Sequence, residues 1–303
     1  RTRTLPSARD RRLTILLTPF MSCSAKLPIY ALFTTAFFPR QWRAVVMIGL
    51  YITGILCGIL YAILLKFTKY KGEPVPFVME LPPYHAPAAS NVLRATWERG
   101  WSFIKKAGTI ILLSTIFVWF TTYFGVVDGS FRMLSEDEID SSILAAIGSA
   151  ICWIFKPLGW GEWQAAVASI TGLVAKENIV GTMGILYGGE GNVYATLAKV
   201  FTGPHRGYSF LVFNLLCAPC FAAIGAIKRE MNSAKWTWFA IGYQTLFAYA
   251  VSLMVYQFGS AFTGNVHVIG LIAAILVLAL IVYMLFFKKY KESTVLTEKV
   301  RVK

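Results

Sequence analysis

Three short polar segments interrupt long apolar stretches, and their residues are the ones that could do chemistry. The first reads LTPFMSCSAKLP, in which Pro19 and Pro28 each remove a helical hydrogen bond. The backbone between them is therefore predicted to unwind, so that freed carbonyls meet the Cys23 thiol and the Thr18 and Ser22 hydroxyls. That composition is typical of a cation site in a broken helix. A proline kink that only packs small residues is the alternative.

The second segment reads NLLCAPC and repeats the combination of proline and cysteine near the middle of another apolar stretch. Cys217 and Cys220 are three residues apart, which predicts that they share a helix face, with Pro219 disturbing the local geometry. Both thiols could then reach one metal ion. Two buried cysteines that serve only for packing are the alternative, because free cysteine is among the most buried residue types.

The third segment places Lys176, Glu177 and Asn178 inside a glycine-bordered apolar stretch. A charge at membrane depth costs roughly 2.5–3.5 kcal/mol, so these side chains are expected to face a cavity or to pair. Unwinding at Gly172 or Gly181 would relieve the cost. An intramembrane carboxylate indicates function by default; a structural ion pair, or a lysine that snorkels from a re-entrant loop, is the alternative.

Composition sets the class of protein that must position these residues. The chain has 303 residues, of which 56% are hydrophobic and 15% charged, whereas soluble domains carry about a quarter charged residues. The apolar residues form blocks, most of them long enough to cross a bilayer. We predict an all-α, polytopic transmembrane helix bundle of about eight segments, some broken or re-entrant: Leu13–Phe38, Ala44–Phe67, Ala107–Phe124, Ile143–Phe155, Trp163–Tyr187, Tyr208–Ile227, Trp236–Phe258 and Val266–Phe287.

Residues 143–187 fit either two spans or one re-entrant hairpin, and the sequence does not choose between them. The 29 Lys and Arg against 15 Asp and Glu give a net charge of +14. These charges cluster between the apolar blocks, which is typical of cytoplasmic loops and argues against a nucleic-acid partner. Residues 1–12 and 288–303 are basic, so both termini are predicted to be cytoplasmic. Residues 128–140 are acidic and predicted to be outside, with a capping box from Ser135 to Glu138.

The sequence carries no phosphate-binding loop, dinucleotide fingerprint, zinc-protease motif or serine nucleophile elbow. We therefore expect no enzymatic activity from the chain itself. Several blocks together resemble the bacterial ferrous iron transport protein B (FeoB) family, and the resemblance covers nearly the whole chain. The residues that carry it are Arg1–Leu5, Asp10–Tyr30, Glu80–Tyr84, Glu98–Trp101, Ala175–Asn178, Pro219–Cys220 and Lys228–Glu230.

This resemblance implies Fe²⁺ import across the bacterial cytoplasmic (inner) membrane through two related gate regions. Carried over by position, Cys23 falls in the first gate, Cys220 in the second, and Glu177 in the broken segment before the second. The predicted metal path is Cys23, Cys220, Cys217 and Glu177, and the predicted transport path adds Thr18, Pro19, Ser22, Lys176, Asn178 and Pro219. Fe²⁺ is expected as the transported substrate, with no cofactor in this chain. Thiolates and carboxylates would also suit Zn²⁺.

Family members normally carry an N-terminal GTP-binding domain and early membrane helices, which are not in this sequence. The resemblance thus implies those parts as partners, in the same or a separate chain, together with the lipid bilayer and a possible homo-oligomer. The expected organisation is an incomplete first gate (1–68), a cytoplasmic Pro-rich loop and interfacial helix (69–106), the second gate with the remaining membrane helices (107–287) and a basic tail (288–303). A nucleoside or organic-solute carrier of related architecture, and a non-transporting membrane sensor or assembly subunit, are the alternatives.

Overall fold

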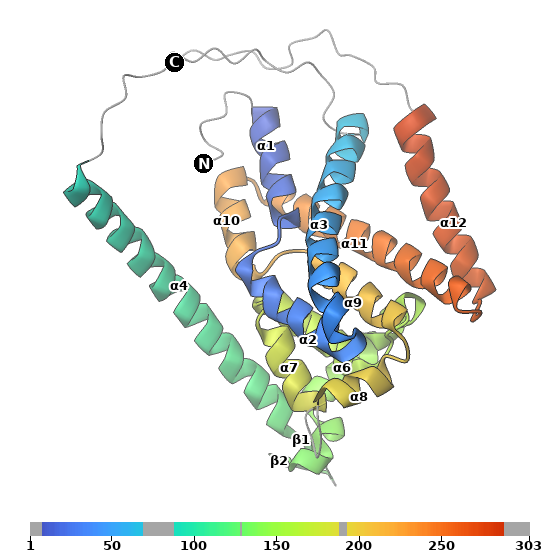
Figure 1. Ribbon diagram of the computed structural model, residues 1–303. Helices are drawn as coiled ribbons and strands as arrows, with labels where there is room; N and C mark the ends of the chain where they lie inside the picture. The colour runs from blue at the N-terminus through green and yellow to red at the C-terminus, as the bar shows by residue number, and fades with distance from the viewer. Residues whose placement is uncertain (1–7, 69–87, 128, 188–192, 288–303) are drawn as a thin grey trace.

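The computed structural model describes residues 8–68, 88–127, 129–187 and 193–287, and these residues form an all-α bundle, as predicted (Figure 1). A single antiparallel hairpin, β1 (Phe124–Val127) with β2 (Ser130–Met133), is the only sheet in this described part. The α-helices are α1 (Ala8–Leu17), α2 (Leu27–Phe37), α3 (Arg40–Thr68), α4 (Ala89–Tyr123), α5 (Ile143–Ile151), α6 (Trp163–Val174), α7 (Asn178–Tyr187), α8 (Val193–Val200), α9 (Pro204–Leu216), α10 (Phe221–Met231), α11 (Ala234–Phe262) and α12 (Val268–Val282), which continues as a π-helix (Tyr283–Phe287).

Five helical stretches among the described residues are long and apolar enough to cross a membrane. Their outer faces are apolar and exposed; Ile269 on α12, for example, is 88% exposed, as expected of a lipid-facing side chain. The protein is therefore a multi-pass membrane protein. The five are Asp10–Phe37, Arg40–Leu65, Pro204–Met231, Ala234–Phe262 and Val268–Phe286. The total of eight segments stays a prediction.

Residues 143–187 do not form two straight spans. α5 and the 3₁₀ helix that follows it meet α6 at an angle of 98°. The predicted block Trp163–Tyr187 is divided into α6 and α7, and the 12 residues of α6 extend only about 18 Å, against a hydrocarbon thickness of about 30 Å. These short, sharply bent helices fit a broken span or a re-entrant loop, and a re-entrant hairpin is one of the two alternatives that the sequence leaves open.

Helix α4 joins two elements that the sequence predicts separately. The interfacial helix expected within residues 69–106 and the membrane block Ala107–Phe124 form one continuous helix of 35 residues, so the predicted boundary at Lys106 is absent. Its N-terminal end lies away from the bundle in Figure 1. Trp97 and Trp101 stack on each other there, with ring centroids 6.1 Å apart. The Pro-rich loop and the basic tail fall mostly or wholly outside the described residues.

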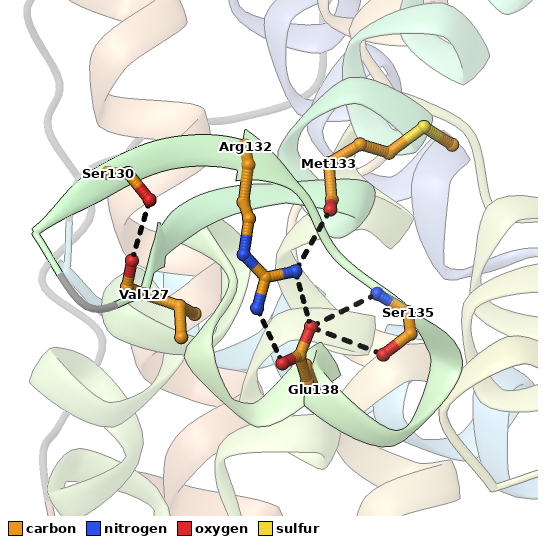
Figure 2. A network of polar contacts seen from close by, with 6 residues as sticks. All are labelled: Val127, Ser130, Arg132, Met133, Ser135 and Glu138. Carbon is orange, nitrogen blue, oxygen red and sulfur yellow. Dashed lines mark hydrogen bonds and ion pairs between the residues drawn. The ribbon is translucent and has the colours of Figure 1, made fainter.

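The helix ends that adjoin the basic segments of the sequence and the hairpin that begins the acidic segment lie at opposite ends of the bundle. α1 begins, and α3 and α12 end, at the upper end of Figure 1, whereas the β1–β2 hairpin lies at the lower end. The predicted capping box of Ser135 and Glu138 is present after the hairpin. Figure 2 shows Arg132 donating to both carboxylate oxygens of Glu138, at 2.7 and 2.9 Å. These hydrogen bonds hold the pKa of Glu138 below its usual value.

Polar side chains of α11 supply hydrogen bonds where other helices are interrupted. Gln244 donates to the Leu16 carbonyl at 3.0 Å, near the end of α1. Gln257 donates to the Pro157 carbonyl at 2.8 Å, in the bend between α5 and α6. Unsatisfied carbonyls are costly where water is absent, so these long-range donors stabilise the breaks.

Candidate functional site

The first polar segment is unwound between its prolines, as predicted. α1 ends at Leu17, a 3₁₀ turn covers Thr18–Phe20, Met21–Cys23 is non-helical, and a second 3₁₀ turn covers Ser24–Lys26 before α2. Pro19 cannot donate a backbone hydrogen bond, which explains why the α-helix ends just before it. The break leaves the Cys23 side chain exposed.

The second polar segment is also broken, and this contradicts the predicted shared helix face of its cysteines. α9 ends at Leu216, and both Cys217 and Cys220 have extended backbone angles before α10 begins. Cys217 is only 4% exposed, whereas Cys220 is half-buried. Because Pro219 interrupts the helix between them, the two thiols face different surroundings.

A cavity of about 760 Å³ lies between the two broken segments. α1 and α10, which both contribute lining residues, contact each other (Figure 1). Six of the predicted site residues line it together: Thr18, Pro19, Cys23, Lys176, Pro219 and Cys220. The remaining lining residues are Ile15, Met21, Ala25, Lys26, Ala223, Ala226, Ile227 and Glu230. Segments about 200 residues apart in sequence therefore bring one thiol each to the same space.

Two buried lysines line this cavity, and each donates hydrogen bonds to atoms of the broken segments. Lys26 is 5% exposed, and its Nζ donates to the Pro19 carbonyl at 3.1 Å and to the Leu215 carbonyl at 2.8 Å. Lys176 is 2% exposed, and its Nζ donates to the Cys217 sulfur at 3.1 Å. The site thus holds two ammonium groups as well as two thiols.

The third polar segment is broken at a different place from the one predicted. The helix is interrupted at Ala175–Glu177, not at Gly172 or Gly181, which lie inside α6 and α7. The break lets Lys176 turn inward while Glu177 is exposed.

Four predicted residues do not line the cavity. Cys217 is outside the lining and its sulfur accepts a hydrogen bond from Lys176, and Glu177 is exposed. The Ser22 hydroxyl instead hydrogen-bonds the Tyr30 hydroxyl at 3.1 Å, and Asn178 is half-buried. In the part of the chain that the structure describes, no three His, Cys, Asp or Glu side chains cluster closely enough to hold a metal ion.

Among the lining residues that sequence reasoning missed, three carry a charged or sulfur-containing side chain: Met21, Lys26 and Glu230. A lysine between two prolines in an apolar stretch was a signal for Lys26, because an intramembrane cation requires partners. Met21 is 57% exposed and adds a thioether beside the Cys23 thiol. Glu230, near the C-terminal end of α10, adds a carboxylate.

Comparison with known proteins identifies relatives over most of the chain. Residues 47–99 match a family model described as ferrous iron transport protein B C terminus, and residues 104–234 match a model named Gate and described as nucleoside recognition. The Fe(2+) transporter FeoB of Methanocaldococcus jannaschii is 39% identical, with 86% of this chain and 39% of that protein covered. FeoB of Staphylococcus aureus strain COL is 36% identical, with 86% and 38% covered.

A third relative, from Porphyromonas gingivalis, is named an Fe(2+) transport protein A/Fe(2+) transporter FeoB fusion protein. It is 33% identical, with 86% of this chain and 36% of that protein covered. The chain therefore spans about two-fifths of the length of these curated relatives. No solved structure matches it.

Proposed function

Since the chain belongs to the FeoB family, whose C-terminal membrane part it represents, we propose that it is the C-terminal permease part of an Fe²⁺ importer in the cytoplasmic membrane. The observation that carries the proposal is the cavity in which Cys23 and Cys220 meet from two broken helices. Broken helices at membrane depth are where transporters bind their ions.

In this proposal Fe²⁺ passes between the two thiols and the carbonyls of the unwound segments. Thiolate ligands suit Fe²⁺, and they bind Zn²⁺ more tightly, so selectivity depends on geometry and metal availability. Cys217 and Glu177 lie outside the cavity lining and would act at neighbouring positions of the path. Thr18 lines the cavity, and its hydroxyl, which donates to the Thr14 carbonyl at 2.8 Å, would assist the ion's passage through its oxygen.

The orientation that we propose puts both termini on the cytoplasmic side and the β1–β2 hairpin outside, because basic loops are retained in the cytoplasm. The cavity then lies toward the cytoplasmic half, between α1 and α10. An N-terminal GTP-binding part, in the same or a separate chain, would be the partner that supplies energy. These assignments draw on the family and the charge pattern together.

The test is Fe²⁺ uptake by cells that express the chain together with the N-terminal part of a FeoB transporter. The double variant Cys23→Ser/Cys220→Ser is expected to insert normally and to lose most uptake, because both cavity thiols are gone. Cys152→Ser is the matched control, since Cys152 lies outside the cavity lining. Unchanged uptake by the double variant would overturn the assignment of the thiols.

A nucleoside carrier is the second candidate, favoured by the match of residues 104–234 to the nucleoside recognition model. Uptake by the same cells separates the two functions. Nucleosides in excess should leave Fe²⁺ uptake unchanged if the chain moves iron. Nucleoside uptake that is indifferent to iron and to Cys23→Ser/Cys220→Ser would favour the carrier.

A further inference from the structure

We propose that Lys26 is a tethered cation that closes the metal path: its ammonium occupies carbonyl oxygens that a transported divalent cation needs, and the ion must displace it. This inference deepens the proposed function and rests on it. Lys26 reaches from the first broken segment to the second, so that one side chain joins the two gates.

The two acceptors of Lys26 are carbonyls that the helix breaks set free. Leu215 lies four residues before Pro219, and in a continuous helix its carbonyl would accept from the amide of residue 219. Proline has no amide hydrogen, so that partner does not exist. The Pro19 carbonyl lies inside the 3₁₀ turn where the first helix is interrupted. Lys26 donates to both, at 2.8 and 3.1 Å.

Oxygens that accept from an ammonium can equally coordinate a metal cation, because both interactions are electrostatic attractions to the same lone pairs. Broken transporter helices use their freed carbonyls in this way. The Lys26 side chain also lines the cavity that holds Cys23 and Cys220. A divalent ion at the thiols would therefore meet a positive charge already in place, in surroundings where Coulomb repulsion is weakly screened.

The alternative is that Lys26 is only a clamp, whose hydrogen bonds hold the two segments together. The two roles predict opposite effects of removing the charge while keeping a donor. Lys26→Gln retains an N–H donor near the carbonyls and loses the charge, whereas Lys26→Arg retains the charge. Lys235→Gln is the matched control for loss of one positive charge, because Lys235 is exposed and outside the cavity lining.

The experiment titrates Co²⁺, a spectroscopic stand-in for Fe²⁺, into the purified full chain in detergent under reducing conditions. Lys26→Gln is expected to bind Co²⁺ at least about tenfold more tightly than the wild type, with thiolate-to-cobalt absorption. Lys26→Arg and Lys235→Gln are expected to match the wild type. Equal or weaker binding by a folded Lys26→Gln variant overturns the inference and leaves the proposed thiol path standing.

A second measurement uses the wild type and does not depend on how a variant folds. Acetylation of Lys26 by an amine reagent, followed peptide by peptide, is expected to be slow without metal and several-fold faster with saturating Co²⁺, because the displaced ammonium becomes accessible. An unchanged or slower rate overturns the inference. Binding of Co²⁺ by neither wild type nor Lys26→Gln contradicts both the inference and the thiol path, whereas binding by Lys26→Gln alone supports both.

Discussion

Gly54 on α3 tests how tightly the two broken segments are held against each other. A Cβ atom at this position would lie 3.0 Å from the Phe20 carbonyl oxygen and 3.6 Å from a methyl carbon of Leu215. The substitution Gly54→Ala therefore inserts a methyl group at the junction of both segments. Ordinary contacts begin at about 3.4 Å, so the neighbouring backbone must move by about 0.4 Å.

The Phe20 backbone has little room to move, because its side chain is only 2% exposed. Its ring lies 4.6 Å from the Tyr61 ring and 5.8 Å from the Phe247 ring, between α3 and α11. Inserting a methyl group into a well-packed interior costs typically 1–3 kcal/mol. Replacing glycine by alanine in a helix interior stabilises the helix by about 1 kcal/mol. We expect Gly54→Ala to destabilise the protein by about 0–2 kcal/mol in total.

The variant Gly49→Ala separates the overpacking cost from the gain in helix propensity. Gly49 lies on the same helix and has nothing within 4 Å of its Cβ position, so only the gain in helix propensity applies. The difference between the two variants is the overpacking cost alone, about 1–3 kcal/mol. The assay is reversible unfolding in mixed micelles with increasing SDS. Equal free energies of unfolding for Gly49→Ala and Gly54→Ala would refute the packing of α3 on the broken segment.

Two further predictions concern other parts of the fold. Gly159 has φ +88° in the bend before α6, and a Cβ atom there would overlap the Tyr256 ring. Gly159→Ala should therefore lower the free energy of unfolding by about 2–4 kcal/mol in the same SDS assay. A smaller loss than for Gly54→Ala would contradict this. Arg132 lowers the pKa of Glu138, so their contribution to hairpin stability is complete above the ordinary carboxyl value of 4.5 and is lost as pH falls through the lowered one. Relative to the intrinsic rate at each pH, hydrogen exchange over residues 124–127 and 129–142 should therefore be faster in Arg132→Gln than in the wild type above pH 4.5, and this difference should shrink as the pH falls. A difference that does not depend on pH would exclude the ion pair as the cause.

The helix breaks at prolines are predictable because the cause is local. Proline lacks the backbone N–H in any surroundings, so Pro19 and Pro219 end helices whatever packs against them. The relation between Cys217 and Cys220 was wrong because it assumed a continuous helix through Pro219. Because Pro219 lies between the two cysteines, the same argument that predicts the break also predicts that they do not share a helix face.

The break in the third segment has a tertiary cause, and residue type alone does not locate it. Glycine was expected to unwind, yet Gly172 stays helical, and a Cβ there would lie 2.5 Å from side-chain atoms of Ile179 on α7. Gly172 thus serves the close approach of α6 to α7. The interruption falls instead at Ala175–Glu177, where Lys176 turns to Cys217, 41 residues away in sequence. A contact between residues so far apart in the sequence leaves no periodic pattern in it.

The same limit explains why reasoning from the sequence chose the thiols and passed over Lys26. Its partner Leu215 is 189 residues away, so no local pattern shows that the lysine completes a broken helix. Gln244 satisfies Leu16 from 228 residues away in the same manner. In a bilayer every freed carbonyl must find a donor, so each predicted break also predicts a polar side chain elsewhere in the chain. Counting breaks and then seeking their distant donors would have selected Lys26 and Gln244, and it distinguishes these two buried side chains from Glu177, which is exposed.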